Sequence, residues 1–112
     1  MKKSTTYMRF LQLLKVIEET EMLEMLTPVE EQMIRVIAIA NDRRQRLSVK
    51  DLMSMDTIAS PATIHKNLKM MREKGWIFLK DTEDARRKQL CLTPQAMSHF
   101  DRIGKAIKRS VR

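Results

Sequence analysis

The chain has 112 residues, of which 43% are hydrophobic and 32% are charged, so its composition predicts a single globular domain and excludes a disordered chain. One cysteine excludes an internal disulfide framework and a cysteine-rich zinc site, and the longest apolar run, residues 36–40, is far too short to span a membrane. Arg9, Gln12 and Lys15 interrupt the stretch that would be the apolar core of a signal peptide. We therefore expect a soluble cytoplasmic protein with no membrane partner.

The formal net charge of +8 is unevenly distributed along the chain. Residues 1–56 contain nine basic and nine acidic side chains, whereas residues 57–112 contain thirteen basic and five acidic ones. The second half therefore holds all of the net positive charge, as expected if a polyanion binds there. A basic surface that only aids solubility fits the charge equally well.

The first predicted element is a helix over residues 4–25, which contain neither Gly nor Pro. Its apolar side chains cover more than half of the helix surface, so one side can pack on its own domain while the other needs a partner. These side chains are Tyr7, Met8, Phe10, Leu11, Leu13, Leu14, Val16, Ile17, Leu23 and Met25.

A second helix is predicted to begin at Pro28, because Thr27 can cap it and Glu30 occupies the acidic position of a capping box. Its expected buried face consists of Met33, Ile34, Ile37 and Ala40. Residues 41–46 are predicted to form a polar connector. The basic residues of this connector favour a solvated loop over a binding element.

A short third helix is predicted over residues 48–56, with Ser48 as its cap and Asp51 three residues later. After a tight turn, Ser60 caps a fourth helix over residues 61–74, which Gly75 ends. The spacing of Ile64, Leu68 and Met71 predicts the buried face of that helix.

The hydrophobic period then changes from helical to alternating. Residues 76–79 and 88–92 are predicted strands joined by a charged loop, with Leu90 and Leu92 pointing inward. A last helix runs from Pro94 to about residue 109, with a buried face of Ala96, Phe100, Ile103 and Ile107. This order predicts a mainly α fold with a small β-hairpin, namely a winged helix-turn-helix.

Four local patterns follow one another in a fairly specific order and spacing. They are Leu47-Ser48-Val49-Lys50-Asp51-Leu52, Ser60-Pro61-Ala62-Thr63-Ile64-His65-Lys66, Glu73-Lys74-Gly75-Trp76-Ile77 with Asp84-Ala85-Arg86-Arg87, and Leu92-Thr93-Pro94. Together they resemble the MarR family of winged-helix transcription regulators over about residues 26–104. Two departures are Ala96, where the family usually has Gly, and an end at Arg112 without the family's longer C-terminal arm.

The resemblance implies a homodimer in which residues 1–112 form one DNA-binding domain. Its winged-helix core would be residues 27–93, and its helical dimerisation arms would be residues 4–25 and 94–110. A two-fold dimer implies a pseudo-palindromic operator on double-stranded DNA. The resemblance also allows a small-molecule effector between the arms and the core, although no residue pattern supports one, and it makes repression the default activity.

The predicted DNA-binding residues come from the helix that begins after Ser60 and from the charged loop. Short side chains at the start of that helix allow close approach to DNA, and Thr63, His65 and Lys66 can bond base edges or phosphates. The full set is Lys50, Ser60, Pro61, Ala62, Thr63, His65, Lys66, Lys69, Arg86, Arg87 and Lys88. The resemblance implies that Asp84 braces Arg86, which reaches the minor groove. The alternative is a solvated helix and a solvated hairpin.

The remaining chemistry-bearing residues give little sign of a catalytic or metal site. His65 and His99 lie far apart without carboxylates at ligand spacing, and neither a phosphate loop nor a nucleophile motif is present, so we expect no metal, no cofactor and no enzyme activity. Cys91 is expected to be a packing or surface residue more than a redox sensor. The alternative function is a winged-helix adaptor that binds protein without sequence-specific DNA binding.

Overall fold

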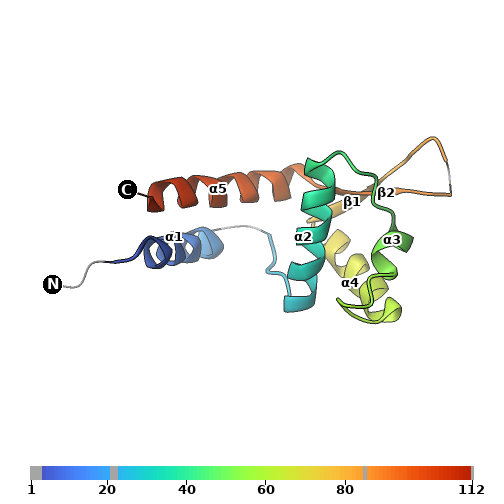
Figure 1. Cartoon of the computed structure of the whole chain (residues 1–112), viewed down its shortest axis with the longest axis horizontal. Helices are drawn as coiled ribbons and strands as arrows, with labels where there is room; N and C mark the ends of the chain where they lie inside the picture. The colour runs from blue at the N-terminus through green and yellow to red at the C-terminus, as the bar shows by residue number, and fades with distance from the viewer. Residues whose placement is uncertain (1–3, 21–22, 85, 112) are drawn as a thin grey trace.

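The computed structural model describes residues 4–20, 23–84 and 86–111. The elements follow the predicted order and confirm a mainly α fold with a two-stranded hairpin (Figure 1). They are α1 (Thr6–Thr20), α2 (Pro28–Asp42), α3 (Val49–Met53), α4 (Pro61–Glu73), β1 (Ile77–Lys80), β2 (Gln89–Leu92) and α5 (Pro94–Ser110).

Four helices begin at the caps that the sequence predicts. The hydroxyl groups of Thr27, Ser48, Ser60 and Thr93 each accept a hydrogen bond from the backbone N–H three residues later. These bonds satisfy amides that a helix leaves unpaired in its first turn. The positions of α2, α3, α4 and α5 in the chain are thus set by short-range chemistry.

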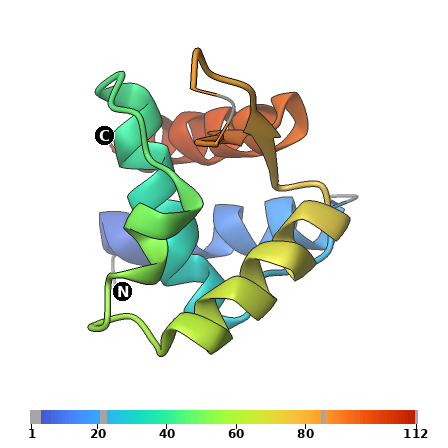
Figure 2. The ribbon, with the colours of Figure 1, turned by 90° about the vertical axis from the view of Figure 1, so that its right-hand side faces the viewer.

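The core lies between α2, α3, α4 and the hairpin. Its side chains are almost wholly inaccessible, among them Met33, Ile37, Leu52, Ile64, Met71, Ile77 and Leu90. Strands β1 and β2 pair antiparallel, with Ile77 opposite Leu92. The backbone N–H of Leu90 also donates to Leu47 O at 2.8 Å, which fastens the hairpin beside the start of α3 (Figure 2).

Helices α1 and α5 run side by side in opposite directions and extend away from the core, with the start of α1 and the end of α5 at the far tip (Figure 1). The Arg9 guanidinium joins their tips through two hydrogen bonds to Ser110 O, at 2.9 and 3.1 Å. The Cα radius of gyration is 16.0 Å, against about 13 Å for a compact chain of this length. We call this pair of helices the arm. None of the described helices is long and apolar enough to cross a membrane.

Two helices end earlier than predicted. Helix α1 ends at Thr20 instead of residue 25; residues 21–22 lie outside the described residues, and residues 23–27 form a non-helical connection. The carbonyls of Glu24 and Met25 in this connection accept hydrogen bonds from the side chains of Trp76 and Lys74 instead of bonds within a helix. Helix α3 ends at Met53 instead of residue 56, in consecutive tight turns.

One further boundary, and the buried face of α5, differ from the prediction for reasons of packing. Asn41 and Asp42 belong to α2 and not to the polar connector. The Asn41 amide donates to Leu90 O at 3.0 Å and accepts from Leu92 N at 2.9 Å, so it joins the end of α2 to β2. In α5, Ile107 is half exposed, whereas His99 and Ser110 are buried.

Candidate nucleic-acid interface

Helix α4 packs through one face and leaves the other exposed. Ile64, Leu68 and Met71 are buried, as the sequence predicts. The seven residues predicted on this helix as DNA contacts are all exposed: Ser60, Pro61, Ala62, Thr63, His65, Lys66 and Lys69. Two turns of a helix that begins with small side chains are therefore free to approach another molecule.

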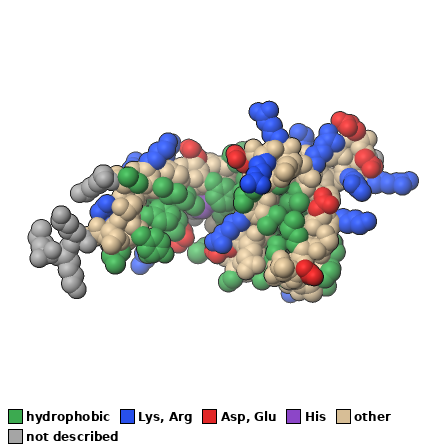
Figure 3. All heavy atoms as spheres, viewed as in Figure 1, with side chains coloured by type: hydrophobic (Ala, Val, Ile, Leu, Met, Phe, Trp, Pro, Cys, Tyr) green, Lys and Arg blue, Asp and Glu red, His purple; other side chains and the backbone are tan. Residues whose placement is uncertain are grey.

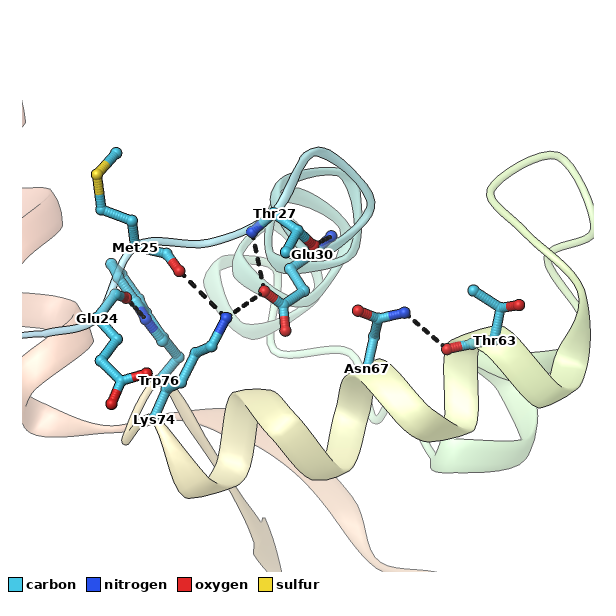
Figure 4. Close-up of polar contacts among 8 residues, drawn as sticks. All are labelled: Glu24, Met25, Thr27, Glu30, Thr63, Asn67, Lys74 and Trp76. Carbon is cyan, nitrogen blue, oxygen red and sulfur yellow. Dashed lines mark hydrogen bonds and ion pairs between the residues drawn. The ribbon is translucent and has the colours of Figure 1, made fainter.

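Local hydrogen bonds fix the start of α4. The Ser60 hydroxyl donates to Thr63 Oγ1 at 2.9 Å and accepts from Thr63 N at 3.3 Å. One turn later, the Asn67 amide donates to Thr63 O at 2.8 Å (Figure 4). Asn67 is half-buried beside this face and is not among the predicted site residues. A helix N-terminus held this way favours an anionic ligand through its free N–H groups and dipole.

The loop between β1 and β2 is held in shape by its own polar groups. The Asp84 carboxylate accepts from Arg86 N at 3.0 Å, and Asp84 O accepts from Arg87 N at 2.9 Å. The Thr82 hydroxyl also bonds the carbonyls of Asp84 and Arg87. Asp84 thus orders the backbone of the loop, while the side chains of Arg86, Arg87 and Lys88 are exposed. We call residues 80–88 the wing.

The fold brings the wing cations beside α3. A groove of about 720 Å³ lies between them, lined by Lys50 of α3 and by Arg86, Arg87 and Lys88 of the wing. Lys66 is not part of this groove, so α4 and the wing present separate surfaces at one end of the molecule (Figure 2). Lys69 instead lines a second groove with Phe78, between α4 and β1.

One cation of the predicted solvated connector, Arg46, lies beside the wing. Arg46 lies 3.3 Å from Glu83 of the wing and shares a depression with Arg87 and Lys88. Nothing in the local sequence indicates this position, because the two paired residues are 37 positions apart. Lys88 lies 3.8 Å from Asp81, so acidic groups partly offset the charge of the wing.

Two side chains near the wing and on the hairpin have shifted pKa values. The Ser48 backbone N–H and hydroxyl, with a smaller contribution from Arg87, hold the pKa of the Asp51 carboxyl below its usual 3.8. Burial raises the pKa of the Cys91 thiol above its usual 9.0, although nearby Lys80 opposes the shift. A protonated thiol is a poor nucleophile, so the structure gives no support to Cys91 as a redox sensor.

The arm exposes apolar side chains beside cations such as Arg102 and Lys105 of α5. Lys and Arg side chains project around the end that carries the hairpin, and apolar side chains gather over the arm (Figure 3). The exposed apolar residues of the arm are Tyr7, Met8, Leu11, Val16, Met97, Ile107 and Val111. A cavity of about 500 Å³ separates the arm from α2 and is lined by Phe10, Arg35, Trp76 and His99 among others.

The described residues show no constellation for metal chemistry. Within residues 4–20, 23–84 and 86–111, no three His, Cys, Asp or Glu side chains gather closely enough to hold a metal ion. His65 is exposed on α4, while His99 is buried with its ring 5.1 Å from that of Trp76 in an edge-on contact. The two histidines therefore belong to different parts of the fold.

The fold is similar to that of solved proteins, although the sequence matches none of the known families. No family model and no curated protein matches the chain in sequence. The chain is similar to the crystal structure of the transcriptional regulator MosR of M. tuberculosis in complex with DNA, with a TM-score of 0.53 and 19% identity over 89% of this chain. It is also similar to the heme sensor protein PefR of Streptococcus agalactiae in complex with heme, with a TM-score of 0.58 and 18% identity over 92% of this chain.

The matched region is a part of those longer chains. The chain spans 64% of the MosR chain and 65% of the heme-bound PefR chain. Heme-free PefR gives a TM-score of 0.54 at 19% identity, and 86% of that chain is covered. At this level of identity the likeness concerns the fold alone, and it confirms the winged-helix fold that the sequence predicts.

Proposed function

We propose that this protein is a homodimeric transcription regulator that binds double-stranded DNA sequence-specifically, places α4 in the major groove and represses by occluding a promoter. The observation that carries this proposal is the bare outer face of α4, which exposes small side chains at its start and Lys66 and Lys69 farther on. A solved neighbour of the same fold, MosR, is in complex with DNA. No enzymatic activity is part of this proposal.

Each exposed group on α4 has a role in this arrangement. Ser60, Pro61 and Ala62 let the helix start approach the phosphate backbone, where free N–H groups favour an anion. Thr63 and His65 offer polar groups for base edges, and Lys66 donates to guanine acceptors or to a phosphate. The buried side of the same helix fixes its direction relative to the core.

The wing is proposed to lie over the neighbouring minor groove. Arg86 would enter the groove, where an A·T-rich sequence concentrates negative potential. Arg87, Lys88 and Lys50 surround one groove on the protein and would bind phosphates on either side. The Asp84 carboxylate assists by holding the backbone of Arg86 in place.

The proposed dimer forms through the arm. Helix α1 has no buried residue in the single chain and exposes Tyr7, Met8, Leu11 and Val16. A second copy related by a two-fold axis would cover these side chains and present two copies of α4 to a pseudo-palindromic operator. Light scattering should give the mass of two chains at micromolar concentration, and a stable monomer near 13.2 kDa would contradict the dimer.

The function is tested by comparing Lys66→Ala with Lys105→Ala on DNA selected by the protein from a random pool. Both changes remove one positive charge, but Lys105 lies on the arm, where it is exposed and pairs with Asp101 at 3.3 Å. Loss of Lys66 should weaken specific binding by about 1–3 kcal/mol, with a smaller loss on random DNA if the side chain reads a base. Loss of Lys105 should have little effect.

Equal small effects would reject α4 as the reading element. In that case binding to DNA would come from diffuse charge, and the protein-binding adaptor would become the better interpretation. Salt provides a second discrimination, because DNA affinity falls steeply with salt concentration while an apolar protein contact does not.

A further inference from the structure

Residues 23–27, which connect α1 to α2, cross the C-terminal end of α4 and are bonded to it by side chains. The Trp76 indole N–H donates to Glu24 O at 2.7 Å, and the Lys74 ammonium donates to Met25 O at 3.1 Å (Figure 4). The side chain of Leu23 lies over Gly75, 3.5 Å from where a Cβ would be. The connection therefore contacts three consecutive residues that follow α4.

The first turn of α2 is also bonded to Lys74, through Glu30. Glu30 is fully buried, and its Oε1 accepts from Lys74 Nζ at 2.7 Å and from Thr27 N at 2.9 Å. The side chain of Lys74 is only 12% exposed. One lysine thus joins the end of α4, the connection from α1 and the first turn of α2 where water is largely excluded.

Helix α5 of the arm also contacts this region, through Trp76. The Trp76 ring packs edge-on against His99 at 5.1 Å between centroids and lies 6.0 Å from Phe100, both in the first half of α5. Beyond these contacts, the cavity of about 500 Å³ separates the arm from α2. Lys74, Trp76 and Glu30 form the joint through which the end of α4 is fixed relative to the arm.

We infer that Lys74, Trp76 and Glu30 are positioning residues that set the separation of the two copies of α4, and hence the half-site spacing that the dimer accepts. This inference rests on the proposed function, because it assumes a dimer formed through the arm. A rotation of about 10° at the joint moves a point about 20 Å away by roughly 3.5 Å, close to the rise of one base pair. A small change at the joint is therefore enough to change the preferred spacing.

The test measures binding to a series of DNA duplexes that carry the selected site with zero, one or two base pairs inserted or removed at its centre. Lys74→Met keeps the aliphatic stem and removes the ammonium, and Trp76→Phe keeps a ring and removes the indole N–H. The wild-type protein should prefer one spacing by at least about tenfold, in line with the one-turn geometry of two-fold sites. In both variants that preference should fall below about threefold or move to another spacing, whereas Lys105→Met should keep the wild-type profile.

A role in stability alone would give a different result. A smaller folded fraction lowers the affinity for every spacing by the same factor and leaves the relative preference unchanged. An unchanged profile in folded Lys74→Met and Trp76→Phe would therefore overturn the inference. If Lys74→Met does not fold, Trp76→Phe alone carries the test, because it removes the indole N–H that donates to Glu24 O and keeps a ring beside His99 and Phe100.

A second measurement needs no DNA. A spin label at Ala62→Cys in a Cys91→Ser background reports the distance between the two α4 helices of the dimer by pulsed electron resonance. Lys74→Met should shift or broaden this distance by at least about 3 Å, near one base-pair rise. Identical distributions would overturn the inference even if DNA binding is confirmed. A shift in a dimer that binds no DNA would uphold the joint and reject the proposed function, and a monomeric wild type would reject both.

Discussion

Replacing Lys74 by methionine should destabilise the protein strongly, because it leaves the buried Glu30 carboxylate without its positively charged partner. Glu30 has no exposed surface, and Lys74 supplies the only positive charge within 4 Å of its carboxylate among the described residues. The second carboxylate oxygen, Oε2, is buried and has no hydrogen-bond partner among residues 4–20, 23–84 and 86–111. After the substitution, Thr27 N–H is the remaining hydrogen-bond donor to this carboxylate in the described structure.

The magnitude follows from the burial of the two partners. Removing one partner of a buried ion pair typically costs about 3–5 kcal/mol. The methionine retains most of the stem, so the loss of packing is small, and the 12% exposure of the Lys74 side chain places the expected cost near the lower limit. A loss of about 3 kcal/mol leaves a domain of ordinary stability folded.

The assay is urea unfolding followed by the fluorescence of Trp76, the single and buried tryptophan. Variants are compared at equal protein concentration, because a dimer gains apparent stability with concentration. The double variant Lys74→Met with Glu30→Gln should recover at least about 1 kcal/mol, since it removes the stranded charge. A cost below about 1 kcal/mol for Lys74→Met, or a double variant no more stable than the single one, would refute this reasoning.

Three further predictions concern the wing, α2 and α3. Replacing Arg86 and Arg87 by Ala should leave the melting temperature nearly unchanged and reduce the slope of log affinity against log salt by about one for each lost phosphate contact, and an unchanged slope would show that the wing does not bind DNA. Asn41→Ala should cost about 1–3 kcal/mol in chemical denaturation, because it leaves two backbone groups of β2 without their partner, and a loss below 0.5 kcal/mol, roughly the lower limit for one hydrogen bond, would contradict this. Asp51→Asn should cost about 0.3–1 kcal/mol near neutral pH. Since Ser48 holds the pKa of Asp51 below its usual 3.8, this stabilisation is present above about pH 4 and is lost as the pH falls through the folded-state pKa; a stability difference from wild type that persists at pH 2 would show that the carboxylate charge is not its source.

The sequence by itself determined where most elements begin and which face of α4 is exposed. The hydroxyls of Thr27, Ser48, Ser60 and Thr93 accept hydrogen bonds from amides three residues later. The start of each helix can therefore be predicted from a few neighbouring residues. The exposed face of α4 followed from the helical period, because the buried residues on one side fix what lies on the other. These two local rules gave the winged-helix order and the candidate residues of α4.

Tertiary structure decided the features that depend on residues far apart in the chain. Helix α1 ends early where Trp76 and Lys74 bond the connection that follows it, and these hydrogen bonds join residues 49 and 52 positions apart. Lys50 lies with the wing cations because the hairpin is hydrogen-bonded beside the start of α3. The same attachment brings Glu83 beside Arg46. A buried ion pair such as Glu30 with Lys74 leaves no periodic pattern in the sequence, because its stabilisation arises only once packing has excluded water from both groups.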